Sequence, residues 1–117
     1  MVQRYRTPII LRTAAQKEKL EKLRIKLALY RWDADDDMMT HIIKVNQMIQ
    51  DIIWNGFAMP EYVMVGALKC TIPDELGRMI DRVWDTLEGS SYKMIVEQFM
   101  KEYIRVGARR TSTLTLN

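Results

Sequence analysis

Apolar residues recur along most of the chain at three- and four-residue steps, the spacing of one face of an α-helix. The clearest stripe is Met38, Ile42, Val45, Ile49 and Ile52. Further apolar positions at Met39, Ile43 and Ile53 widen it, which is typical of a central helix packed on more than one side. Five such stretches are separated by Gly, Pro and capping residues. We therefore expect an all-α fold, a compact bundle of about five helices.

Start and stop residues mark where each helix is expected. We expect the first helix to be capped by Thr13 and the second by the acidic run ending at Asp37. The expected cap of the fifth helix is Ser90 or Ser91. Pro60 and Pro73 are expected at the starts of the third and fourth. The second helix is predicted over residues 36–55, and Gly107 is the expected C-cap of the fifth. The chain then divides into an extended or disordered lead-in over 1–12, a helical domain over 13–107 and a basic flexible tail over 108–117.

Gly66 lies inside the predicted third helix. A glycine there indicates either a close approach between helices or a weak point, because glycine is a poor helix former.

The net charge of +3 conceals an uneven distribution. Residues 1–32 contain nine basic and two acidic residues, a net +7, whereas residues 33–104 contain six basic and 13 acidic residues, a net −7. The remaining residues add three arginines. This asymmetry indicates charge pairing between molecules or contact with nucleic acid. The alternative is a solvated basic face on the first helix.

The acidic run Asp33–Asp37 has the D-x-D-x-D spacing that begins an EF-hand calcium loop. Met38 stands where that loop needs Gly, however, and Lys44 where it needs Glu. Carboxylates also stabilise the free N–H groups at a helix N-terminus. We therefore expect the run to begin a helix rather than to bind a metal.

Catalytic and cofactor chemistry is sparse. With one His and one Cys, the chain forms no internal disulfide and no four-ligand zinc site, which favours a reducing, cytoplasmic setting. His41 has no nucleophile at a recognisable spacing, and Cys70 lies among apolar residues. Neither a phosphate-binding loop nor a signal peptide or membrane span is apparent. We expect no enzyme activity, cofactor, metal, small-molecule substrate or membrane partner.

From Leu20 onward, the order of features resembles the capsid region of the Gag polyprotein of copia-type LTR retrotransposons, and the match covers roughly residues 14–106. An amphipathic helix is followed by the acidic turn 33–37, the pair His41-Ile42, a loop glycine at Gly56 and the segment Leu68-Lys69-Cys70-Thr71-Ile72-Pro73. The last helix ends Glu102-Tyr103-Ile104-Arg105. Lys69, Thr71 and Leu76 depart from the family pattern. The family's zinc knuckle and its tryptophan-rich upstream half are missing, so the chain is similar to a C-terminal-type capsid lobe.

The resemblance implies a retroviral-capsid-like lobe that self-associates into a shell around RNA, with itself or full-length Gag as partner. A capsid lobe needs an apolar patch outside its own core. Trp54, Phe57, Met59 and Tyr62 are the candidate interface, since Trp and Tyr are enriched in interface hot spots. The alternative is that these four residues cap the core of the bundle.

Two other functions stay open. A nucleic-acid-binding regulator would hold RNA phosphates through the candidate contacts Lys17, Lys22, Arg24, Arg31, Arg109 and Arg110. A Gag-derived inhibitor would join a growing Gag shell and, lacking the other half, block it.

Overall fold

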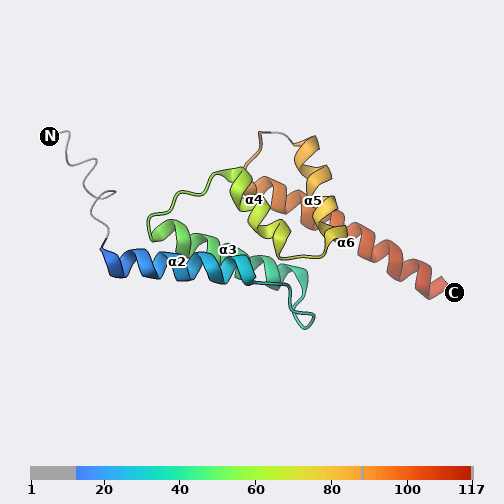
Figure 1. Cartoon of the computed structure of the whole chain (residues 1–117). Helices are drawn as coiled ribbons and strands as arrows, with labels where there is room; N and C mark the ends of the chain where they lie inside the picture. The colour runs from blue at the N-terminus through green and yellow to red at the C-terminus, as the bar shows by residue number, and fades with distance from the viewer. Residues whose placement is uncertain (1–12, 88, 117) are drawn as a thin grey trace.

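The computed structural model describes residues 13–87 and 89–116, with side chains as far as Gly107. These residues form five helices: α2 (Ala14–Leu29), α3 (Met38–Trp54), α4 (Glu61–Cys70), α5 (Asp74–Thr86) and α6 (Tyr92–Leu116) (Figure 1). No strand occurs in this part of the chain. The predicted all-α bundle of about five helices is confirmed, while the prediction for residues 1–12 falls outside the described residues.

The helices form two groups joined by α4. α2 and α3 lie side by side as a hairpin, and α5 packs on α6 at the other end of the molecule (Figure 1). α4 contacts α2, α3, α5 and α6, so it bridges the two groups. The last turns of α6 extend beyond the other helices (Figure 1).

The core confirms the main stripe of α3. All five predicted positions, from Met38 to Ile52, are buried, together with Ile80, Ile95 and Phe99 from α5 and α6. The positions predicted to widen the stripe behave differently: Met39 is 50% exposed and Ile43 is 55% exposed, while Ile53 is half-buried. The prediction that α3 packs on several sides is wrong for Met39 and Ile43, because the neighbouring helices leave the face that carries them uncovered.

The predicted starts of α2 and α3 are confirmed by their hydrogen bonds. Thr13 and Gln16 form a reciprocal capping box at α2. At α3, Asp37 Oδ1 accepts a hydrogen bond of 2.7 Å from the backbone N–H of Thr40. Hydrogen bonding to Thr40 lowers the pKa of the Asp37 carboxyl below its usual 3.8, because it stabilises the charged form. The acidic run therefore begins a helix, as predicted.

The predicted C-cap at Gly107 is wrong, and the structure excludes one of the two interpretations of Gly66, the close approach between helices. α6 does not end at Gly107, which lies inside the helix, and the backbone of residues 108–116 continues α6. Gly66 is not a point of close approach, since a Cβ built there meets nothing within 4 Å. The close approach occurs at Gly77 of α5, where a Cβ would lie 3.2 Å from Cγ of Lys69 on α4.

Polar contacts between residues far apart in the sequence join α3, α4, α5 and α6. Glu61, in the first turn of α4, accepts a hydrogen bond of 2.6 Å at Oε2 from the backbone N–H of Tyr92, so it caps the start of α6. The Tyr92 hydroxyl donates to Asn46 Oδ1 on α3 (2.6 Å). Lys69 forms an ion pair of 2.8 Å with Asp81 on α5. None of these long-range pairs has a local sequence signal.

Candidate interaction surfaces

The structure divides the four candidate interface residues into two pairs. Trp54, at the end of α3, is 81% exposed, and Tyr62, in the first turn of α4, is 68% exposed. Phe57 and Met59, in the connection between these helices, are half-buried and pack against the core. The predicted interface therefore keeps Trp54 and Tyr62 as surface groups, whereas Phe57 and Met59 complete the core.

The ring of Phe57 is covered from outside by the first helix. The guanidinium carbon of Arg24 lies 4.4 Å from the centroid of the ring, a cation–π contact. Arg24 also lies 3.6 Å from Glu21. Arg24, predicted to contact nucleic acid, thus packs against the α3–α4 connection within its own chain.

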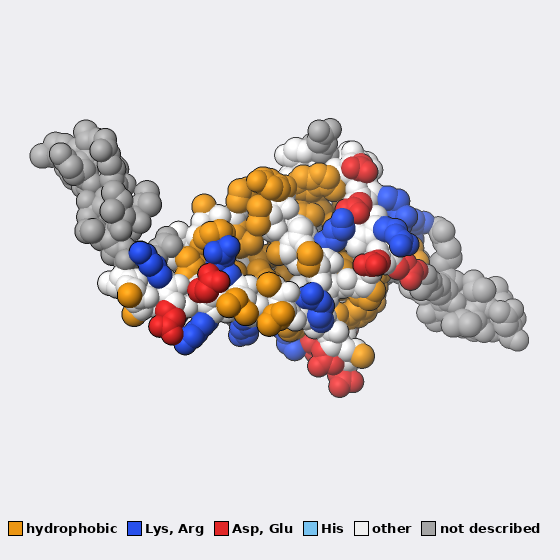
Figure 2. All heavy atoms as spheres, viewed as in Figure 1, with side chains coloured by type: hydrophobic (Ala, Val, Ile, Leu, Met, Phe, Trp, Pro, Cys, Tyr) orange, Lys and Arg blue, Asp and Glu red, His pale blue; other side chains and the backbone are white. Residues whose placement is uncertain are grey.

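Six other large apolar side chains are exposed, and the sequence analysis did not predict them to be on the surface. They are Ile25 and Leu29 on α2, Met39 and Ile43 on α3, and Met94 and Ile104 on α6. The helical periodicity could have identified some of them, because they lie outside the buried stripe of their helix. On α2, for example, Ile25 and Leu29 lie opposite the buried Leu20 and Leu27. Hydrophobic side chains gather on one face of the molecule over the α3–α4 connection, α4 and the α2–α3 hairpin (Figure 2).

The predicted basic contacts do not form one continuous face. At roughly 100° per residue, Lys17 and Arg24 lie on one side of α2 and Lys22 on the opposite side. Lys22 forms an ion pair of 3.2 Å with Glu18, and Arg31 donates hydrogen bonds to the carbonyls of Ala28 and Tyr30. These contacts hold two of the candidate side chains against their own helix.

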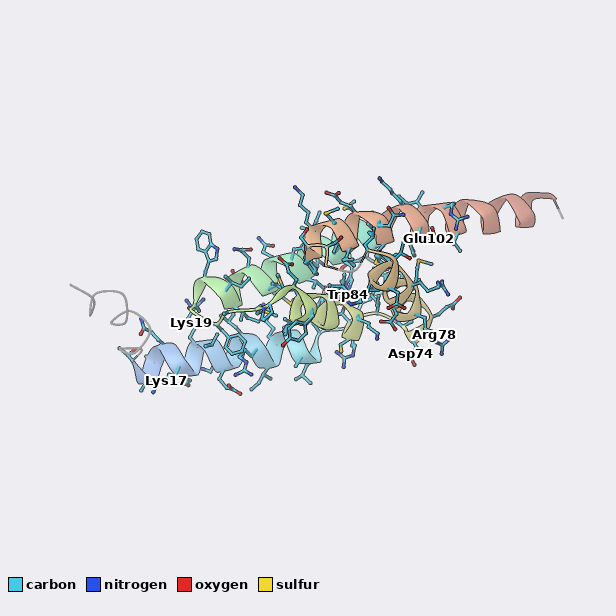
Figure 3. All side chains as sticks on the ribbon, turned by 90° about the horizontal axis from the view of Figure 1, so that it is seen from above. Lys17, Lys19, Asp74, Arg78, Trp84 and Glu102 are labelled. Carbon is cyan, nitrogen blue, oxygen red and sulfur yellow. The ribbon has the colours of Figure 1, made fainter. Side chains whose placement is uncertain are left out.

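The other candidate cations are on α6 and near the start of α2. Arg109 and Arg110 belong to the extension of α6, and their side chains fall outside the described residues. Lys17 and Lys19 lie at one end of the molecule, and Asp74, Arg78 and Glu102 lie toward the other (Figure 3).

His41 is buried beside a hydroxyl group that the sequence interpretation did not link to it. Its Nε2 lies 2.7 Å from Thr71 Oγ1, and that hydroxyl donates to the carbonyl oxygen of Leu68 (2.6 Å). Because a hydroxyl has one hydrogen, His41 Nε2–H must be the donor in the first bond. Nδ1 is buried and has no hydrogen-bond partner among the described residues, and burial disfavours the charged form, so the neutral imidazole is favoured.

The surroundings of His41 favour a structural role. Its ring stacks on Tyr30, with centroids 5.4 Å apart and planes 9° apart, and Trp32 lies at 6.2 Å. Burial lowers the pKa of His41 below its ordinary 6.5, opposed in part by the nearby charge of Asp36. Both His41 and Thr71 are inaccessible to solvent, so the pair joins the end of α2, α3 and the α4–α5 corner.

Two open grooves lie near this corner. One, of about 900 Å³, is lined by residues of both charge signs, including Arg31, Lys69, Asp74 and Arg78. The other, of about 710 Å³, lies between α5 and α6 and is mainly apolar. Among the residues with described side chains, no group of three or more His, Cys, Asp or Glu is placed to hold a metal ion. Within the described helices, none is long and apolar enough to cross a membrane.

Comparison with known proteins gives no match: no protein-family model matches the sequence, and neither a curated protein nor a solved structure is similar to it at a significant level. The resemblance to the Gag capsid region therefore stays a prediction from the order of sequence features.

Proposed function

We propose that this protein is a non-enzymatic structural protein that self-associates through helical surfaces, as its resemblance to the capsid region of copia-type Gag implies. The observation that carries the proposal is the set of large apolar side chains left outside a closed core, above all Trp54 and Tyr62. Exposed apolar patches commonly mark protein contacts. Trp and Tyr also contribute more binding energy than most residues when an interface covers them.

RNA binding ranks second. The exposed cations of α2 support it, because phosphate contacts need only positive charge and reach. Their spread around the helix, the Lys22–Glu18 pair and the packing of Arg24 on Phe57 favour assembly instead. Co-assembly with full-length Gag is the third possibility, and it uses the same apolar surface.

Light scattering after size-exclusion chromatography tests self-association over a concentration series. We expect the mean mass to rise with protein concentration, and Trp54→Ala to reduce that rise without changing the far-UV circular dichroism. Met94→Ala, an exposed apolar residue on α6, is the matched control. A strict monomer at the highest concentration, at both low and high salt, refutes the proposal.

Electrophoretic mobility shifts with RNA at about 50 mM salt test the second function, since nonspecific phosphate binding is strongest at low salt. If Lys17→Gln weakens an observed shift, α2 contacts phosphate. The absence of any shift rejects RNA binding. For co-assembly, an unchanged yield of Gag particles in the presence of this chain counts against the third possibility.

A further inference from the structure

α3 carries a second stripe on the side away from the core. Its members follow one another at steps of three and four residues and contain no charged group: Met39, Ile43, Gln47, Gln50 and Trp54. At roughly 100° per residue they occupy a sector of about 80°, centred some 140° from the buried stripe. All five are exposed, so α3 has a helix-packing pattern on a face that no other described helix covers.

We propose that this face of α3 binds the same face of a second copy, with the two helices antiparallel about a two-fold axis near Gln47. The inference rests on the proposed self-association and names the surface that performs it. Such an interface must be self-complementary, because the same patch contributes from both sides. An uncharged stripe does not repel its own copy, and Gln side chains carry both a donor and acceptors, so they bond to one another.

The ends of the stripe are complementary as well. Met39 and Trp54 lie at opposite ends of a face about 22 Å long, at 1.5 Å per residue. An antiparallel partner therefore brings the Trp54 ring of one copy near Met39 of the other, and a thioether beside an aromatic ring is a favourable contact. Trp54, the most exposed large apolar residue of the described chain, becomes buried in this arrangement.

Charges along one edge of the stripe favour the same register. Lys44 and Asp51 are exposed and lie on the same flank of α3, seven residues apart. A two-fold axis in the plane of the interface keeps each flank on its own side, so Lys44 of one copy faces Asp51 of the second, twice. Lys44 also forms an ion pair of 2.7 Å with Asp36 of its own chain, so its ammonium group would be shared between Asp36 and Asp51 of the second copy. Flanking charge pairs of this type set helix orientation in coiled coils.

The first experiment measures dimer affinity by sedimentation equilibrium up to about 1 mM protein, because one helix face gives an interface at the small end of the specific range, ~1,000 Å². We expect Ile43→Asp to weaken the dimer at least about tenfold, since the new carboxylate would lie near Asp51 of the second copy. Leu29→Asp is the matched control, an equally polar change at an exposed apolar site on the outer face of α2. It is expected to change the dissociation constant less than about twofold.

The second experiment tests the axis by disulfide cross-linking in a Cys70→Ser background, which removes the chain's one thiol. Gln47→Cys is expected to give a covalent dimer on mild oxidation, because residues near a two-fold axis of packed helices bring their Cα atoms within the ~7 Å a disulfide spans. Leu29→Cys is expected to stay monomeric under the same conditions.

The outcomes separate the two proposals. A self-associating protein whose affinity is unaffected by Ile43→Asp, and which Gln47→Cys does not cross-link, overturns the α3 pairing but leaves self-association standing. A protein that is monomeric at every concentration overturns both. Circular dichroism of each variant establishes that the helices are retained.

Discussion

Replacing Thr71 by Val removes the only hydrogen-bond partner that the His41 imidazole has among the described residues. The backbone around Thr71 is unaffected, because Leu68 O still accepts from the Thr71 N–H at 3.0 Å and Trp32 N–H still donates to Thr71 O at 2.8 Å. The imidazole, by contrast, loses its hydrogen bond. Whichever ring nitrogen carries the hydrogen in the variant, that N–H group is buried and has no acceptor among the described residues once the hydroxyl is gone.

An unpaired buried donor costs about 1–3 kcal/mol. We therefore expect Thr71→Val to lower the free energy of unfolding by about 2 kcal/mol. His41→Leu in the same background removes the stranded N–H. The double variant should then be less destabilised than the sum of the two single variants, with a coupling energy of about 1–2 kcal/mol.

Urea unfolding followed by far-UV circular dichroism measures these energies. All four proteins are compared at one low protein concentration, so that self-association does not add to their stability. A Thr71→Val variant within about 0.5 kcal/mol of the unmodified protein, together with a coupling energy near zero, refutes the buried His41–Thr71 pair.

Three further predictions concern pH and helix stability. Burial holds the pKa of His41, the chain's only histidine, below 6.5, so below that pH the folded state binds fewer protons than the unfolded state. The free energy of unfolding should therefore fall as the pH decreases below 6.5, by at most about 1.4 kcal/mol per pH unit. His41→Leu should abolish that slope in urea titrations between pH 7 and 5, a window above the one in which Asp37 protonates. Asp37→Ala should lower the thermal unfolding midpoint, whereas Asp37→Asn, which keeps the cap, should lower it much less; equal losses contradict the capping role. Gly66→Ala should raise the free energy of unfolding by about 0.5–1 kcal/mol. Gly77→Ala should raise it less, because its Cβ crowds Lys69. The reverse order in urea unfolding would contradict the close approach of Gly77 to Lys69.

Local rules determined a large part of this fold from the sequence alone. Thr13 and Asp37 cap their helices through hydrogen bonds to N–H groups three residues away, so their role needs no knowledge of the rest of the chain. The buried stripe of α3 follows equally well from periodicity. The prediction that Gly107 ends α6 is wrong. A glycine ends a helix where the backbone turns left-handed, and at Gly107 the backbone stays helical.

Beyond that main stripe, only the tertiary structure decided which apolar positions are buried and which are exposed. Met38 and Met39, or Ile42 and Ile43, are the same residue types one position apart, yet the first of each pair is buried and the second is exposed. Periodicity specifies the angle at which a side chain leaves the helix axis, but not which angles the neighbouring helices cover. The pairing of His41 with Thr71, across 30 residues, has the same origin: it exists because the α4–α5 corner packs against α3, and no local pattern encodes that contact.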